Sequence, residues 1–194
     1  IVGMALDAGA AAAWMRQNVG ISRIVFLGIC SGGKVAISAA ARDGGAAGLA
    51  LWSCEALGGL RTAAIETRKR VFAVRDYARK LLRLETWRKI ILLRVNVEAV
   101  KKAVVRGEEA PDEREMAGEA RVLETFAGYK GRAIFIYGTH DPDTKVAAER
   151  YAGFCRDKGI CAEFHAIEGA NHSFYSLESE RAVMELTEKW ISRF

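Results

Sequence analysis

The chain has 194 residues, 51% of them hydrophobic, and a formal net charge of +5 at pH 7. This length fits one compact domain, or one domain with a small insertion, and no apolar run approaches the roughly 20 residues of a membrane span. The four cysteines have no CxxC spacing and are too few for a disulfide framework, so neither a zinc site nor a disulfide scaffold is expected. Buried thiols and the lack of a recognisable signal peptide predict a cytoplasmic protein.

The chain opens with alternating helices and strands. An alanine-rich helix is expected over residues 5–18, ended by Gly20, and Ile24–Leu27 reads as a strand buried on both faces. A second helix over residues 31–42 and a second strand over 48–52 follow. This alternation predicts an α/β fold with a parallel, doubly wound sheet.

The turn after the first strand carries the most specific motif. Its sequence, Gly28-Ile29-Cys30-Ser31-Gly32, has the G-x-nucleophile-x-G spacing of a nucleophile elbow, with Cys30 at the apex. Small residues two positions before and after the apex let strand and helix approach closely. The backbone N–H of Ser31 would then point at the substrate oxygen. A purely structural Gly-rich turn is the alternative, since neither the P-loop nor the dinucleotide pattern fits.

A long segment without turn signals then interrupts the alternation. Residues 61–106 contain fourteen Lys or Arg against four acidic residues, whereas residues 107–124 contain seven acidic residues and two arginines. We expect a helical insertion over residues 55–128, between the core segments 1–54 and 129–194. Its basic charges are either solvated helix faces or a surface for a partner or an acidic membrane, and no nucleic-acid partner is expected.

The α/β pattern resumes in the last third of the chain. The expected elements are a strand at 133–137, a helix at 144–158, a strand at 161–167 and a final helix at 177–194. The final helix has an inward stripe formed by Val183, Leu186, Trp190 and Phe194.

Three loops at the carboxyl ends of predicted strands carry Cys30, Asp141 and His172. Open α/β sheets bind ligands at this edge. The order nucleophile, acid, base is that of the α/β-hydrolase triad. Cys30 would attack a carbonyl carbon, His172 would take the thiol proton, and Asp141 would fix the imidazole tautomer. We further expect the imidazolium and the helix amino terminus to lower the pKa of the Cys30 thiol.

Other residues compete for two of these roles. Asp143 is the reserve acid, because Asp141 precedes a proline in a turn where aspartate is common. His140 and His165 compete with His172, but His165 lies inside a strand and His140 directly precedes the acid.

The segments GICSGG, YGTHDPD and GANHSF resemble the elbow, acid loop and histidine loop of the α/β-hydrolase superfamily. The insertion lies where that superfamily carries a helical cap. Residues 52–93 are similar to the cap of hydrolases associated with exosortase A systems, some of which place Cys in the elbow. Cys in the elbow also resembles dienelactone hydrolase, a family without such a basic cap.

The resemblance implies a hydrolase that cleaves a small acyl substrate, an ester or thioester, with no cofactor or metal. An acyltransferase, or an inactive hydrolase-fold protein that binds a partner or membrane surface through its cap, is the alternative. The superfamily has further strands before the elbow, and an early loop there supplies the second oxyanion donor. We see neither here, so we expect a truncated or fragment-like core whose elbow strand pairs with a second chain or a second copy.

Overall fold

The computed structural model describes residues 1–58 and 113–194. Four strands form one sheet in the order β1-β2-β3-β4, and every neighbouring pair is parallel. The strands are β1 (Val25–Ile29), β2 (Gly48–Trp52), β3 (Arg132–Gly138) and β4 (Ala162–Ile167). The predicted parallel sheet is therefore confirmed. Most of the predicted insertion falls on residues 59–112, outside the described residues, and the cap and its boundaries stay a prediction.

The helices also follow the predicted order. They are α1 (Val2–Trp14), α2 (Ser31–Asp43), α6 (Glu113–Phe126), α7 (Pro142–Lys158) and α8 (Leu177–Ile191). The first predicted helix is longer than α1, because the chain continues through a π-helical turn, η1 (Met15–Val19), before Gly20 ends it in the left-handed conformation at φ 72°. No described helix has the length and apolar character needed to cross a bilayer.

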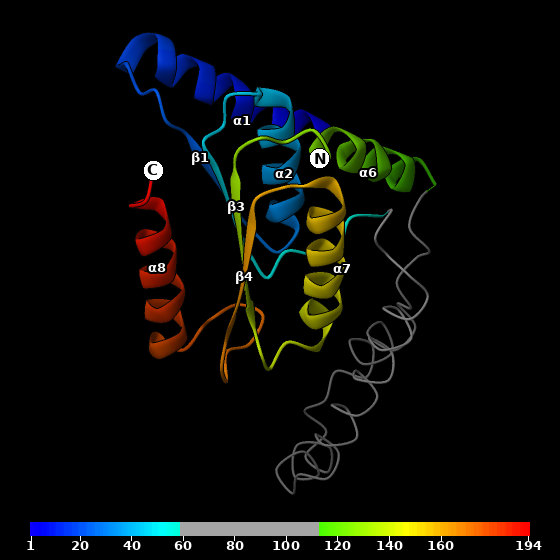
Figure 1. The fold of residues 1–194 in the computed structure, drawn as a ribbon, viewed down its shortest axis with the longest axis vertical. Coiled ribbons are helices and arrows are strands. Elements are labelled where there is room, and N and C mark those ends of the chain that lie inside the picture. Colours follow the sequence, from blue (N-terminus) through cyan, green and yellow to red (C-terminus); the bar gives the residue numbers. More distant parts are fainter. Residues whose placement is uncertain (59–112) are drawn as a thin grey trace, which may run out of the picture.

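The sheet has a different cover on each face (Figure 1). On one face, Leu49, Leu51 and Phe135 pack with buried side chains of α2, α6 and α7. On the other face, Ala50 and Ile134 pack with Val183 and Trp190 of α8. Successive residues of the central strands point to opposite faces, and both faces are covered. The continuous apolar runs of these strands follow from this burial.

Strand β1 is the least covered part of the sheet. Among the described residues its only strand neighbour is β2. Leu27 and Ile29 point to the α8 side of the sheet, where α8 packs on β2, β3 and β4, and they remain 47% and 45% exposed. Within residues 1–58 and 113–194, the elbow strand thus has one unpaired edge and two exposed apolar side chains.

Candidate active site

The turn between β1 and α2 has the strained geometry that the sequence predicts. Cys30 adopts φ 55° and ψ −125°, a backbone conformation that residues other than glycine rarely adopt. Backbone hydrogen bonds hold it there: the Cys30 N–H donates to the Trp52 carbonyl at 2.9 Å, and the Gly33 N–H donates to the Cys30 carbonyl at 3.0 Å. The apex of a tight strand-to-helix turn is therefore occupied by a thiol.

The glycines of this turn are needed at slightly different positions from those expected. A Cβ at Gly28 would lie 2.7 Å from the Gly32 carbonyl carbon, so the position before the apex is closed, as predicted. A Cβ at Gly32, however, would meet nothing within 4 Å. After the apex, the position with no room for a side chain is Gly33, where a Cβ would lie 2.8 Å from the Cys54 Cβ. The reason is that the backbone of Gly32 lies against Gly28, whereas the position of its own Cβ faces open space.

The acid and histidine loops lie against each other beyond β3 and β4. The His140 N–H donates to the Ala170 carbonyl at 2.9 Å, and the Thr139 N–H donates to the Ile167 carbonyl at 3.1 Å. A Cβ at Gly138 would lie 2.7 Å from the Ala170 carbonyl carbon, so a larger residue would push the loops apart. Glycine at the end of β3 therefore allows the two loops to meet.

This packing brings Asp141 and His172 together. Asp141 is buried, with 5% of its side chain exposed, and its Oδ2 lies 2.5 Å from His172 Nδ1. Because an ionised carboxylate only accepts hydrogen bonds, Nδ1 carries the proton and Nε2 is left as the basic nitrogen. The imidazole is 39% exposed, so it is held on one side and open on the other.

The competing residues lie elsewhere. His140 is exposed next to the acid, and His165 on β4 pairs with Glu163, with 3.5 Å between Nε2 and Oε2. The side chain of Asp143 lies outside the described part of the structure, and its reserve role stays a prediction. Among the described histidines, His172 is the one in contact with Asp141.

Cys30 does not complete the contact with His172. No hydrogen bond joins the Cys30 thiol to the imidazole in the described part of the chain. Instead the thiol donates to Glu55, with 3.5 Å between Sγ and Oε1. Burial raises the pKa of the Cys30 thiol, and the negative charge of Glu55 raises it further, while the Ser31 N–H acts in the opposite direction. The expected lowering of the Cys30 pKa is therefore wrong for this arrangement.

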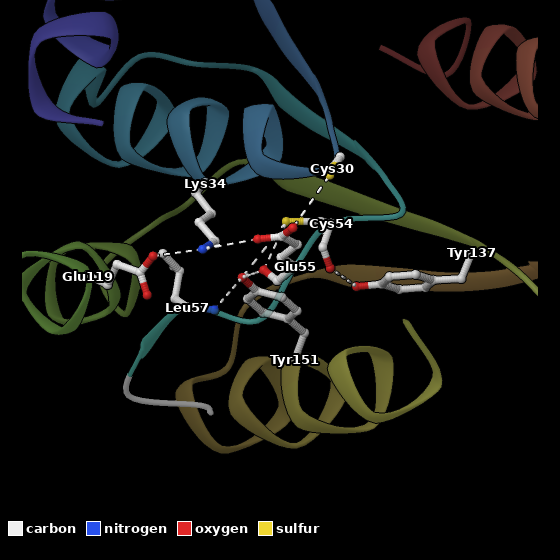
Figure 2. A network of polar contacts seen from close by, with 8 residues as sticks. All are labelled: Cys30, Lys34, Cys54, Glu55, Leu57, Glu119, Tyr137 and Tyr151. Carbon is white, nitrogen blue, oxygen red and sulfur yellow. Dashed lines mark hydrogen bonds and ion pairs between the residues drawn. The ribbon is translucent and has the colours of Figure 1, made fainter. Parts of the chain in front are cut away.

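Sequence reasoning missed the residues behind this contact (Figure 2). Lys34 is buried in the second turn of α2, and its Nζ lies 3.2 Å from Glu55 Oε2 and 2.8 Å from Glu119 Oε1. Two signals were available in the sequence. Glu55 follows the carboxyl end of β2, at the same edge of the sheet as Cys30, and Lys34 is the one charged residue between Ser31 and Ala41.

Known proteins were compared at the levels of sequence and structure. No family model and no curated protein sequence matches the chain. Solved structures do match. A protein assigned as a dienelactone hydrolase from Klebsiella pneumoniae has a TM-score of 0.60 at 14% identity, and the match covers 98% of this chain and 60% of that chain. A monoacylglycerol lipase from Paleococcus ferrophilus has a TM-score of 0.55 at 16% identity, with 98% and 76% covered.

The described residues form a partial α/β-hydrolase fold. The same agreement extends to dipeptidyl peptidase 4 of Porphyromonas gingivalis, with a TM-score of 0.61 at 14% identity over 98% of this chain and 22% of that one. At these identities the likeness concerns the fold alone. The chain spans 60% of the length of the dienelactone hydrolase and 22% of that of the peptidase. What it does must therefore be argued from its own residues.

Proposed function

We propose that this chain carries the nucleophile, acid and base of an α/β-hydrolase that cleaves an ester or thioester through Cys30, His172 and Asp141. The contact of 2.5 Å between Asp141 Oδ2 and His172 Nδ1 is the observation that supports this most. It joins an acid and a base from two loops that follow neighbouring parallel strands. The strained conformation of Cys30 gives the elbow reading a second, independent support.

The chemistry would have two half-reactions, acylation of Cys30 and hydrolysis of the acyl-enzyme. His172 Nε2 takes the thiol proton as Cys30 Sγ attacks the acyl carbon, and the oxyanion accepts a hydrogen bond from the Ser31 N–H. The alcohol or thiol then leaves with the proton from His172, and a thioester remains on Cys30. Water, deprotonated by His172, hydrolyses this thioester and restores the thiol. Transfer of the acyl group to another acceptor would make the same site an acyltransferase.

Hydrolysis of short p-nitrophenyl esters and acyl thioesters tests the proposal. We expect Cys30→Ala to abolish turnover and Cys30→Ser to keep a small part of it, because the same base activates a hydroxyl less readily. Circular dichroism should show both variants folded, since the apex side chain is only partly buried. Equal turnover by the parent protein and Cys30→Ala would remove Cys30 from the nucleophile role.

One observation favours a second function, that of an inactive hydrolase-fold binding protein. Burial and the adjacent Glu55 raise the pKa of the Cys30 thiol, so less of the thiolate is present at neutral pH. In that case the exposed edge of β1 would be the contact surface, and its partner a second chain or a second copy. Site-specific labelling of Cys30 by an acylating probe, with release of the label over time, supports the enzyme; the absence of labelling supports the binding protein.

Two finer parts of the proposal depend on residues outside the described ones. The likeness of residues 52–93 to the cap of exosortase A-associated hydrolases would place this chain in that group. The basic charges of residues 61–106 would provide a peripheral contact with an anionic membrane. Binding of the protein to anionic but not neutral vesicles, lost at high salt, is the expected outcome for that contact.

A further inference from the structure

Three charged side chains form a continuous line behind the Cys30 thiol (Figure 2). Glu119 Oε1 accepts a hydrogen bond from Lys34 Nζ at 2.8 Å, Lys34 Nζ lies 3.2 Å from Glu55 Oε2, and Glu55 Oε1 lies 3.5 Å from Cys30 Sγ. The two carboxylate oxygens of Glu55 thus contact different groups. One faces the ammonium group and the other faces the thiol.

The inner pair of this line is removed from water. The side chains of Lys34 and Glu119 are 5% and 2% exposed, whereas that of Glu55 is 34% exposed. Glu119 Oε2 is buried with no hydrogen-bond partner in the described part of the structure. A buried charge is costly unless it is paired, so Glu119 fixes Lys34 more firmly than a surface carboxylate would. Glu55, by contrast, would gain hydration by turning away, and Lys34 opposes that movement.

The backbone under Glu55 is fixed as well. Tyr151 Oη donates to the Glu55 carbonyl at 2.9 Å and accepts from the Leu57 N–H at 3.2 Å. Tyr137 Oη donates to the Cys54 carbonyl at 3.4 Å. Both tyrosines are buried. These bonds fix where the Glu55 side chain starts, and the ammonium group of Lys34 faces one of the two oxygens at its end.

Three separate parts of the fold meet in this line. Lys34 belongs to α2, Glu55 to the segment that follows β2, and Glu119 to α6. Lys34 and Glu119 are 85 positions apart in the sequence. The position of α6 is therefore connected through side chains to the group that would perform the chemistry.

We propose that Lys34, braced by Glu119, is a positioning residue that holds the Glu55 carboxylate against the Cys30 thiol. Lys34 acts through Glu55 and not directly. Burial and the charge of Glu55 raise the pKa of Cys30. Lys34 Nζ lies against the Glu55 oxygen that faces away from the thiol. Of the other groups near the thiol, Cys54 is neutral because burial raises its pKa to about 12, and the Ser31 N–H lowers the pKa of Cys30.

The inference deepens the proposed function and rests on it for its consequence in catalysis. Its test does not, because it measures the Cys30 thiol itself and needs no turnover. If Cys30 proves inactive towards esters and thioesters, the same measurement still decides whether the line of charges operates.

The experiment is alkylation of Cys30 by iodoacetamide as a function of pH, followed by peptide mass spectrometry in a Cys161→Ser background, which removes the exposed thiol. Glu55→Gln keeps the shape and removes the charge. We expect the titration midpoint to fall and the alkylation rate at pH 7 to rise about three- to tenfold, because the thiol no longer faces a negative charge. Lys34→Met should change the rate in the same direction, because it removes the ammonium group that faces Glu55 Oε2.

The double variant provides the decisive comparison. Adding Lys34→Met to Glu55→Gln should change the rate no further, since Lys34 has lost the group through which it acts. Because Lys34→Met leaves Glu119 buried and unpaired, a variant with Lys34→Met and Glu119→Leu together keeps the test available if the single variant does not fold. Arg16→Met is the matched control: it breaks the ion pair with Asp43 at the opposite end of α2 and should leave Cys30 unchanged.

Three results would overturn the proposal. The first is an unchanged Cys30 titration in both Lys34 variants. The second is a midpoint that rises, which would mean that Lys34 acts by its charge and not by its position. The third is an effect of Lys34→Met that is equally large with and without Glu55.

Discussion

Asp141 and His172 stand 31 positions apart in the sequence, yet the carboxylate and the imidazole are in hydrogen-bond contact. Asp141 is almost fully buried and His172 is partly open to solvent. The contact therefore fixes the imidazole at Nδ1 and leaves Nε2 outside the contact with the carboxylate, as a general base requires.

Asp141→Asn tests this contact directly. An asparagine amide can donate to Nδ1 and thereby favour the tautomer with the proton on Nε2, where it no longer accepts the thiol proton. We expect kcat for ester or thioester hydrolysis to fall by about 10²- to 10⁴-fold, with little change in the melting temperature. Asp143→Asn is the matched control and should retain activity. If Asp143→Asn is the more damaging change, the reserve residue is the acid.

The sheet and the contact between Asp141 and His172 could be predicted because short-range sequence signals determine them. Apolar runs such as Ile24–Leu27 require two covered faces, and residues that follow parallel strands reach the same edge of the sheet. Asp141 and His172 follow neighbouring strands, so their meeting follows from strand order alone.

The partner of Cys30 could not be predicted in the same way. The contact between Lys34 and Glu119 joins helices that lie far apart in the sequence, and no local pattern says which acidic residue of α6 turns inward. The expected insertion begins at Glu55, although this residue directly follows the carboxyl end of β2. The pKa of Cys30 is raised, and not lowered as expected, first because burial of the thiol disfavours the thiolate and then because a carboxylate lies beside it.

The elbow offers a matched pair of glycine substitutions. Gly28→Ala should lower the free energy of unfolding by about 1–3 kcal/mol, because its Cβ overlaps the backbone of Gly32 and Gly33, which has no room to shift. Gly32→Ala, four positions later, meets open space within α2 and should be neutral, or stabilising by up to about 1 kcal/mol. Urea denaturation of both variants measures the difference. Equal stabilities would mean that strand and helix do not approach as closely as described.

The open edge of β1 predicts association. Leu27 and Ile29 are nearly half exposed on a strand that has one neighbour among the described residues, and such edges pair readily with another strand. We expect light scattering to show a mass above that of the monomer that increases with protein concentration, and Leu27→Lys to reduce it. Met184→Lys changes an exposed apolar residue of α8 instead and should have no effect. A parent protein that stays monomeric at all concentrations would contradict the prediction.

The pH dependence of Cys30 is the most direct measure of the site. A thiol whose pKa is raised is protonated over a wider pH range, so the thiolate forms only at higher pH. We expect the alkylation midpoint to lie above about 8.5, the value of a free thiol, and hydrolysis in the range of pH 6 to 9 to increase with pH. The buried thiols of Cys54 and Cys155 do not interfere, because burial raises the pKa of each to about 12.

His172→Ala separates the two possible states of the thiol. If Cys30 rests against Glu55, as the 3.5 Å contact indicates, this change leaves the alkylation midpoint where it is while it abolishes hydrolysis. A midpoint well below 8.5 that rises when His172 is removed would instead show a resting thiolate–imidazolium pair, and the contact with Glu55 would then not describe the protein in solution.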